Sequence, residues 1–452
     1  MTMSGFVPVP STRSLRLRRA RVPATLVDST FVSPMPPDAE GLLEVDIEVA
    51  DGRIAAVAPA DSFPSEGSID LYRSQVWPAF VDIHTHLDIS HTWLRSPNPD
   101  GTVAGAQRAA EVDRNTRWPE RDVIRRMDFG LRCAYAHGVV AIRTHLNSNR
   151  IQYRNAWSAF RQMRDQWAGQ IDLQATSLLQ LPELVGDFGT EIADLVAEAG
   201  GNLGVAISMT AEEHARIADR FAGWLNHMFS LAEERGLDLD LHVDENGDAG
   251  ARGLHAVART ALRRGFKGRI LCGHCCSLAV QPDDMIEATL AACASAGIAV
   301  VSLPMCNMYL QDRSSRRTPR WRGITLLHEM RERGIAVSLG TDDVRNAWYG
   351  FGDQDMVEVF TQGVRIAHLD RPYDDWPRAV TATPARVMRL ADRGIIRVRA
   401  PADLVLFNAR DMSELLSRPQ SDRVVLRGGR PITRDLPSYR ELDDLQTPVA
   451  TP

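Results

Sequence analysis

The sequence lacks the features that mark membrane, nucleic-acid-binding and disulfide-rich proteins. It has no apolar run near the roughly 18 residues that a membrane span requires, and no long basic run beyond Arg16–Arg21. Its formal charge of −6, from 52 basic and 58 acidic residues, argues against nucleic acid as a main partner. Six cysteines in 452 residues are no disulfide framework, so we expect a reducing, cytoplasmic environment.

The basic residues are almost all arginine, since Lys267 is the one lysine. Arginines are dense near the start of the chain, but no apolar stretch of a secretory signal accompanies them. Strand-like alternation follows directly, so we do not expect a mitochondrial presequence either. The lone pair Cys272-x-x-Cys275 has no second pair to complete a zinc site, and we expect it to pack in the interior.

What the sequence does contain is a long alternation of strand-like and helix-like segments. Hydrophobic residues at 44% and charged residues at 24% are values of a globular protein. Helical patterns such as Arg121–Ala136, Ala211–Arg235 and Leu254–Arg264 fall between short apolar runs. This alternation predicts an α/β fold of the (β/α)8 barrel type. The eight predicted strands are Val76–Ile83, Val139–Arg143, Asp172–Ser177, Leu203–Ile207, Leu237–Leu241, Arg269–Cys272, Ala299–Leu303 and Ile335–Leu339.

Both ends of the chain carry short strand patterns separated by turn residues. Val45–Val49 and Ile54–Val57 flank Asp51-Gly52, which is a strong hairpin signal. Ala402–Phe407 and Arg423–Arg427 are again short strands. We therefore expect both ends to form one small β-sandwich domain. The predicted limits are 16–75 and 393–440 for this domain and 76–392 for the barrel, with residues 1–15 disordered.

The most informative motif is His84-Thr-His86, directly after the apolar run Val76–Ile83. Side chains alternate along a strand, so two imidazoles placed two residues apart project to the same side of the strand's C-terminal end. Two histidines arranged in this way can form half of a divalent-metal site. The pair alone is a weak signal, and its weight depends on how the other strands end.

Three other predicted strands also end in residues that bind metals or move protons. Because a parallel barrel places its chemistry at the C-terminal ends of its strands, these residues should meet the histidine pair in one metal site. The long connection Ser90–Asn115 at the same end is expected to shape substrate access. The residues concerned are His242 and Glu245 after Leu237–Leu241, His274 after Arg269–Cys272, and Asp342 and Asp343 after Ile335–Leu339.

These residues resemble those of the amidohydrolase superfamily, and within it the bacterial cytosine deaminase type. The resemblance runs from about residue 40 to about residue 430, and the combination of motifs is far more specific than any one of them. The matching stretches are Pro78-x-Phe-Val-Asp-x-His84-x-His86-Leu-Asp88, Arg143-Thr-His145, Gln180, His242-x-Asp-Glu245, His274, Pro304-x-x-Asn307-x-x-Leu-Gln311-x-Arg313 and Asp342-Asp343-Val-x-x-x-Trp348-Tyr349.

The resemblance implies one divalent ion, Fe²⁺ or Zn²⁺, because three imidazoles and a carboxylate suit either ion. A bound dication lowers the pKa of water from about 15.7 toward about 7, which makes water a nucleophile at neutral pH. The implied ligands are His84, His86, His242 and Asp342. The implied catalytic residues are Asp342, which takes a proton from the water, His274, which contacts the water or the substrate, and Glu245, which carries protons to the ring nitrogen and the leaving amine.

The resemblance also implies three substrate contacts, namely Gln180 for the amide edge and Asp343 and Trp348 for the pocket wall. Two interpretations stay open, since Glu245 could instead orient a metal-binding histidine, and His145 suits a supporting role as well as a substrate contact. A further residue, Asp88, is expected to support the site rather than bind the metal. Near the substrate, the sequence departs from the cytosine enzymes at Leu181-Pro182, Ile207-Ser-Met-Thr210 and Asn147, which puts cytosine itself in doubt.

The scarcity of lysine excludes a binuclear site of the superfamily type. Binuclear members bridge two metals with a carboxylated lysine at the end of a barrel strand. Lys267 precedes the strand that carries His274 and therefore lies at the wrong end. The second zinc-deaminase fold is not expected either, because the sequence has no His-x-Glu with Pro-Cys-x-x-Cys.

We therefore expect a mononuclear, metal-dependent aminohydrolase that deaminates an amino-substituted nitrogen heterocycle and releases ammonia. Cytosine-like compounds are the leading substrate class, with isocytosine, pterin, creatinine and aminotriazine as alternatives. A hydrolase that opens a cyclic amidine or lactam ring could use the same residues, whereas a non-catalytic relative would have lost one of them. The expected partner is a small heterocyclic substrate, without nucleic acid or membrane, and a homo-oligomer is left open.

Overall fold

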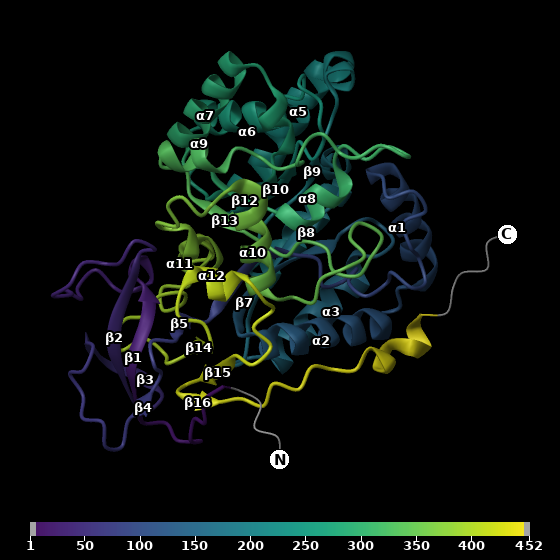
Figure 1. Ribbon diagram of the computed structural model, residues 1–452. Coiled ribbons are helices and arrows are strands. Elements are labelled where there is room, and N and C mark those ends of the chain that lie inside the picture. Colours follow the sequence, from purple (N-terminus) through teal and green to yellow (C-terminus); the bar gives the residue numbers. More distant parts are fainter. Residues whose placement is uncertain (1–5, 447–452) are drawn as a thin grey trace. The chain divides into compact units, whose positions relative to one another are not determined.

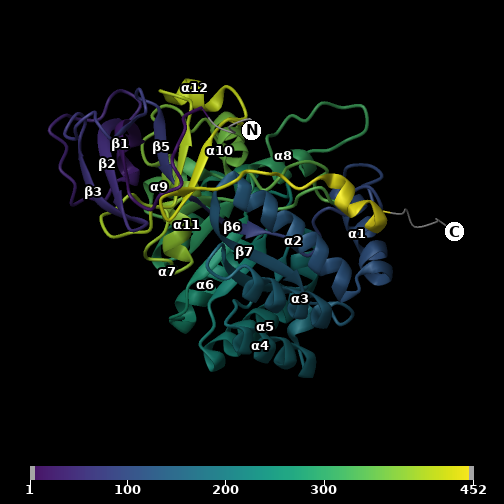
Figure 2. The same ribbon diagram turned by 90° about the horizontal axis from the view of Figure 1, so that it is seen from below.

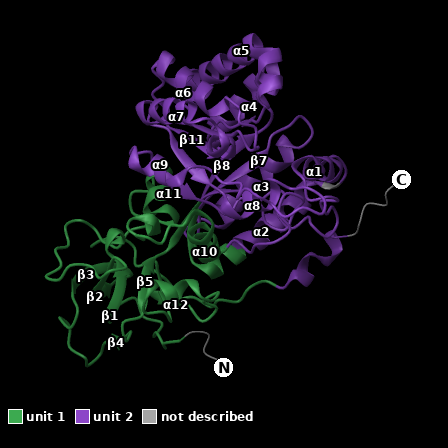
Figure 3. Ribbon diagram, turned by 45° about the horizontal axis from the view of Figure 1, so that its top comes forward, with its two compact units in different colours: residues 1–82, 132–141, 355–437 green, residues 83–131, 142–354, 438–452 purple. Residues whose placement is uncertain are grey.

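The computed structural model describes residues 6–446 (Figure 1). The disorder expected for residues 1–15 falls partly on residues 1–5, which lie outside the described residues, and the first strand begins at Leu15. The chain divides into two compact units (Figure 3). No helix within residues 6–446 combines the length and the apolar character needed to cross a bilayer. Residues 1–82, 132–141 and 355–437 form unit 1, and residues 83–131, 142–354 and 438–452 form unit 2.

Unit 1 is built on one eight-stranded sheet to which both ends of the chain contribute. The strand order is β16-β15-β14-β5-β1-β2-β3, and β4 pairs with β1. The strands are β1 Leu15–Pro23, β2 Leu42–Ala50, β3 Arg53–Pro59, β4 Ile69–Asp70, β5 Gln75–Pro78, β14 Leu404–Phe407, β15 Val424–Arg427 and β16 Arg430–Pro431. The helices that lie in this unit are α10 Met356–Ala367, α11 Ala382–Val387 and α12 Met412–Leu416.

Local chemistry explains the hairpin and the core of this sheet. Ala50 of β2 pairs with Arg53 of β3. The two residues between them, Asp51 and Gly52, both have positive φ, as a two-residue hairpin turn requires. Apolar side chains at alternate positions of the strands form one core. That core includes Leu17, Val45, Ile47, Leu404 and Leu426.

Eight further strands form the (β/α)8 barrel that the sequence predicted. They occur in two groups, β6-β7-β8 and β9-β10-β11-β12-β13, each in chain order. Isolated parallel bridges join the two groups on both sides, Gln180 with Ala206 and Thr85 with Asp342, so the order of strands closes. The strands are β6 Phe80–Thr85, β7 Val139–Asn147, β8 Asp172–Leu178, β9 Ala206–Ile207, β10 Leu239–Val243, β11 Ile270–His274, β12 Ala299–Ser302 and β13 Val337–Leu339.

Helices alternate with these strands, and α4, α5 and α6 pack side by side in chain order (Figure 2). The helix predicted over Ala211–Arg235 has those limits as α5, because Thr210 and Glu213 form a capping box at its start and Gly236 adopts a left-handed conformation at its end. The helices that lie wholly or mainly in unit 2 are α1 Val103–Arg117, α2 Glu120–His137, α3 Tyr153–Gln166, α4 Asp187–Ala199, α5, α6 Gly253–Arg264, α7 Asp283–Ala296, α8 Pro304–Leu310 and α9 Leu327–Glu332.

One predicted strand is divided in the structure, and another is reduced to two residues. The run Val76–Ile83 is two strands, since β5 pairs with β14 in the sheet of unit 1, whereas β6 begins at Phe80 in the barrel. Pro78 lacks an N–H to continue a ladder, which allows the chain to change sheets here. Strand β9 covers only the last two residues of the predicted Leu203–Ile207. At Gly204 a Cβ would lie 2.4 Å from the carbonyl oxygen of Asp240, so neighbouring backbones approach too closely for a regular strand with side chains.

Candidate metal centre and active site

Main-chain pairing at the strand ends sets the positions of the predicted metal ligands. Strands β10 and β11 are parallel, and His242 lies opposite Gly273 in their register. Where the barrel closes, the N–H of Asp342 donates to the carbonyl oxygen of His84 at 2.9 Å, and the N–H of His86 donates to that of Asp342 at 3.3 Å. Three of the four ligands are thus tied to one another by backbone hydrogen bonds before their side chains are considered.

Gly273 provides the space that the ring of His84 occupies. A Cβ at position 273 would lie 2.9 Å from Cε1 of that ring, which is closer than real side chains come. A glycine at this strand position therefore lets the imidazole enter the end of the barrel beside His242.

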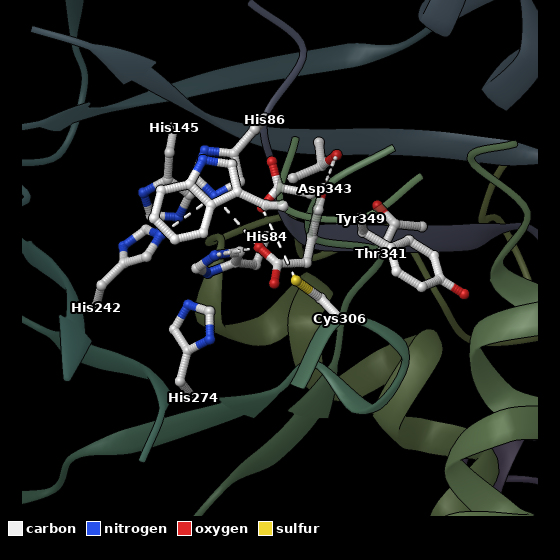
Figure 4. Close-up of polar contacts among 12 residues, drawn as sticks. His84, His86, His145, His242, His274, Cys306, Thr341, Asp343 and Tyr349 are labelled. Atoms are coloured by element: carbon white, nitrogen blue, oxygen red, sulfur yellow. Dashed lines mark hydrogen bonds and ion pairs between the residues drawn. The ribbon is translucent and has the colours of Figure 1, made fainter. Parts of the chain in front are cut away.

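The side chains of His84, His86 and His242 gather around Asp342, and Figure 4 shows the three imidazoles turned toward one another. One ligand atom of each of the four residues lies within 4.8 Å of the other three. Nε2 of His86 is 3.2 Å from Nε2 of His242 and 3.3 Å from Oδ1 of Asp342, and Nε2 of His84 is 3.4 Å from the same oxygen. All four residues are buried. Three imidazole nitrogens and a carboxylate oxygen at one buried point fit a divalent metal.

The charges around this cluster favour a cation. Burial opposes the charged form of His86, but the carboxylates of Asp343 and Asp342 raise its pKa to about 9. Burial would raise the pKa of Asp342, yet the imidazoles of His274, His84 and His86 hold it well below its usual range. A field that stabilises a proton on His86 also stabilises a dication, which would take the proton's place between the same groups.

His145 lies beneath the cluster rather than in the substrate cavity. Its ring centre is 4.1 Å from that of His84, and its Nε2 is 3.7 Å from Oδ1 of Asp240. The other oxygen of Asp240 accepts a hydrogen bond from Arg143 at 3.0 Å. Since Arg143 already neutralises Asp240, this second group of potential ligands suits support of His84 better than a second metal.

Asp88 has the supporting position that the sequence analysis expected. Its Oδ2 accepts hydrogen bonds from the main-chain N–H and the side-chain amide of Asn147, at 2.7 and 3.1 Å. It thereby ties the segment after β6 to the end of β7. Asp88 is not among the clustered metal-ligating atoms within the part of the chain that the structure describes.

The two predicted proton-handling residues, Glu245 and His274, adjoin the metal cluster. Oε1 of Glu245 lies 3.5 Å from Nδ1 of His274. Burial raises the pKa of Glu245 well above its usual range, and the carboxylates of Asp342 and Asp343 add to this effect. Burial also lowers the pKa of His274 to about 3, so its imidazole is neutral. A carboxyl group whose pKa is raised in this way suits proton transfer to a substrate.

A cavity of about 470 Å³ reaches the cluster, and all three predicted substrate contacts line it. Gln180 follows β8, and Asp343 and Trp348 follow β13. Burial raises the pKa of Asp343 to about 7, while Oδ1 of this residue accepts a hydrogen bond from the amide of Asn346. The inner end of the cavity also contains Glu245 and His274.

Another wall of this cavity is a helix that was not predicted from the sequence. The sequence predicts a long connection over Ser90–Asn115, but Val103–Arg117 is helix α1, and the side chain of Thr102 caps it by accepting from the N–H of Gly105. The threonine cap was a usable signal. A second signal was the spacing of three or four residues between the positions that face the cavity, which is the spacing of one face of a helix. These positions are Val103, Gln107, Ala110, Glu111 and Arg114.

The cysteines are free and buried, as expected for Cys272 and Cys275. Cys306 lies near the site, with Sγ 3.9 Å from Oδ2 of Asp343 (Figure 4). No sequence motif singled it out. Burial raises the pKa of its thiol well above the usual range, which keeps it a neutral neighbour of the carboxylates.

The barrel and the His/Asp cluster at its strand ends define the class of this protein as a metal-dependent hydrolase. The sequence matches the Amidohydrolase family over residues 119–433, and the chain belongs to this family. Its predicted enzyme class, a hydrolase of carbon–nitrogen bonds other than peptide bonds, is confirmed.

Similar proteins cover nearly the whole chain. A pterin deaminase of Rhizobium rhizogenes is 47% identical over 97% of this chain and 98% of its own length. The N-isopropylammelide isopropyl amidohydrolase of a Pseudomonas species is 23% identical, with 86% and 94% covered. A 5-methylcytosine deaminase structure from Klebsiella pneumoniae superposes with a TM-score of 0.76 at 23% identity, over 93% of this chain and 97% of that one. The structural similarity supports the barrel with an additional β-domain.

Proposed function

We propose that this chain is a metal-dependent deaminase of a pterin-type heterocycle that releases ammonia. The observation that carries the proposal is the 47% identity to a pterin deaminase over nearly the full length of both chains. Pterin was one of the alternatives to the cytosine-like class, and it now becomes the leading substrate. Its amino group stands beside ring nitrogens, which is the arrangement that the predicted chemistry requires.

The cavity supports a substrate of this size. Its volume of about 470 Å³ is within the range of roughly 300–1,000 Å³ that is typical of small-molecule sites. The side-chain amide of Gln180 can both donate to and accept from the amide edge of a pterin. The indole of Trp348 offers an aromatic face to a planar ring.

We propose that His84, His86, His242 and Asp342 hold one ion, either Fe²⁺ or Zn²⁺. When bound, such an ion supplies Lewis acidity, which makes a water molecule nucleophilic at neutral pH. Binding through neutral imidazoles releases the proton that the carboxylates otherwise hold on His86. Metal affinity should therefore rise with pH through the range in which this histidine loses its proton.

The proposed catalytic residues of the chain then move protons around the substrate. Asp342 accepts a proton as the attacking oxygen forms its bond to the amino-bearing carbon. Glu245 donates a proton to the ring nitrogen as that carbon becomes tetrahedral. It then takes the remaining proton of the attacking oxygen as the carbonyl forms and passes it to the amine, which leaves as ammonia, and the proton on Asp342 returns to Glu245. Gln180, Asp343 and Trp348 hold the ring so that the reacting carbon faces His274 and Glu245.

A substrate panel tests this function. The protein is loaded with one equivalent of Fe²⁺ or Zn²⁺ and assayed for ammonia release from pterin, cytosine, isocytosine, creatinine and an aminotriazine. We expect pterin to have the highest kcat/KM. Absence of ammonia from every compound would overturn the proposal. Product mass separates the ring-opening alternative, because deamination exchanges an NH group for oxygen whereas ring opening adds a whole water.

Three further expectations, on location, oligomeric state and domain limits, also remain proposals. We propose a cytoplasmic location, which the six free, buried cysteines support. We leave open a homo-oligomer, which light scattering after size-exclusion chromatography tests. We also keep the domain limits 16–75 with 393–440 and 76–392, which limited proteolysis tests.

A further inference from the structure

We propose that Asn307 is a positioning residue that fixes His274 in the tautomer carrying its proton on Nε2. Asn307 lies on α8, Pro304–Leu310, and its side chain is fully buried. The proposal rests on the proposed function, because it concerns how two residues of that active site, His274 and Glu245, are presented to the substrate.

One amide group contacts both proton-handling residues. Nδ2 of Asn307 lies 2.9 Å from Nδ1 of His274 and 3.4 Å from Oε1 of Glu245. An amide nitrogen carries two hydrogens, so it can donate to both acceptors at once. The same stretch of chain holds the backbone of Glu245, since Nε2 of Gln311 donates to its carbonyl oxygen at 3.3 Å.

The acceptor oxygen Oε1 of Glu245 determines which end of the amide faces these groups. The opposite orientation would place the carbonyl oxygen of Asn307 where Nδ2 now lies, facing an oxygen of the carboxylate. Two acceptors at that separation repel each other, whereas the N–H donor is attracted. The acceptor oxygen of Glu245 at this position therefore holds the amide with its nitrogen toward His274.

The tautomer of His274 follows from this orientation. A ring nitrogen that accepts a hydrogen bond carries no proton, and a neutral imidazole then carries its single proton on the other nitrogen. Nε2 of His274 has no hydrogen-bond partner within residues 6–446, and the residue lines the substrate cavity. His274 is thus prepared to donate a hydrogen bond from Nε2 to an oxygen in the cavity.

This arrangement separates the roles of the two residues. As an N–H donor, His274 stabilises negative charge that develops on the attacking oxygen, but it cannot take a proton from the water. Proton removal and delivery are left to the carboxyl groups. A purely structural role for Asn307 would need only its volume and would leave both the tautomer and the turnover number insensitive to loss of its N–H groups.

Histidine nitrogen NMR tests the tautomer without any substrate. The full chain is labelled with ¹⁵N-histidine and loaded with Zn²⁺, and the signals of His274 are assigned by their loss in His274→Gln. Protonated and unprotonated ring nitrogens have widely separated ¹⁵N shifts, and we expect Nε2 to be protonated. In Asn307→Asp, the new carboxylate accepts a hydrogen bond from Nδ1, so the proton should move to Nδ1. In the matched control Gln311→Leu, the pattern should not change.

Kinetics supply the second readout. We expect Asn307→Asp and the similarly sized Asn307→Leu to lose about 100- to 1,000-fold in kcat, as when one donor to a developing oxyanion is removed. KM for pterin should stay within about threefold and bound zinc should be unchanged, because neither substrate anchors nor metal ligands are altered.

Three results would overturn the proposal. These are a wild-type His274 that is unprotonated at Nε2, a tautomer that stays the same in Asn307→Asp, or a wild-type kcat in both variants. If Asn307→Asp does not fold, the wild-type spectrum and Asn307→Leu still decide. A protein that has the expected tautomer but deaminates no heterocycle would refute the proposed function, while the assignment of the tautomer would stand.

Discussion

The inner and the outer parts of the active site are built in different ways. The metal cluster lies at the ends of barrel strands, where backbone hydrogen bonds join His84, His86 and Asp342. Another wall of the cavity belongs to helix α1, whose polar side chains Glu111 and Arg114 line it from a connection between strand and helix. The barrel thus positions the proposed metal ligands. The helix inserted after β6 can change which substrate fits the cavity without moving those ligands.

The largest effect should come from the inner part. Asp342→Ala removes the carboxylate of the proposed ligand set and its negative charge from the cluster. We expect both the bound metal and the ammonia-releasing activity to fall to background. Metal content by mass spectrometry and ammonia release measure the two losses. A variant of the outer wall, Glu111→Ala, should keep its metal, and a full metal complement in Asp342→Ala would contradict the assigned ligand set.

A second inner variant should separate proton transfer from metal binding. Glu245→Gln keeps the size of the side chain but removes its exchangeable carboxyl proton. We expect kcat to fall by about 100- to 10,000-fold, which is the usual contribution of a general acid or base. The metal content should be that of the wild type. Normal turnover in this variant would remove Glu245 from the mechanism and leave it as a support of His242.

The outer wall should show a different kinetic signature. Arg114 is tied to Oδ1 of Asn147 at 2.9 Å and lines the cavity on α1. From this position we expect the guanidinium of Arg114 to hydrogen-bond the substrate. A hydrogen bond to a charged group is worth about 1.5–3 kcal/mol, so Arg114→Ala should raise KM by roughly ten- to a hundredfold. The turnover number and the metal content should change little.

The matched control for this variant is Arg108→Ala on the same helix. Arg108 is exposed and pairs with Asp100, and it does not line the cavity. Steady-state kinetics with pterin should place Arg108→Ala close to the wild type. A loss of metal in Arg114→Ala would show that the two parts of the site are not independent.

The smallest effect is expected at the single lysine. Lys267 is exposed and precedes β11, at the end of the barrel strand away from His274. Lys267→Arg should keep one metal per chain and its kcat within about twofold, because a mononuclear site needs no carboxylated lysine. A large loss of metal or activity would reopen the binuclear alternative.

The sequence predicted most of the barrel and all residues that the structure gathers at the metal cluster. Strand periodicity placed each of these residues at a strand end, and that placement survives shifts of one or two residues in the strand limits. The failures have other causes. The run Val76–Ile83 is split because its first half pairs with β14 in the sheet of unit 1 and its second half belongs to the barrel. Such pairing is a tertiary property. Helix α1 was missed because its polar residues face a cavity, so its apolar periodicity is weak.

By itself, the sequence determined the donor set, since residues at the C-terminal ends of barrel strands must meet once the strands close. Its single lysine also predicts one metal held without a lysine bridge. Only the tertiary structure decided that α1 forms a wall of the cavity and that the amide of Asn307 contacts both His274 and Glu245. These contacts join segments that are distant in the sequence and share no periodic pattern. Their geometry depends on tertiary packing, which local sequence patterns do not predict.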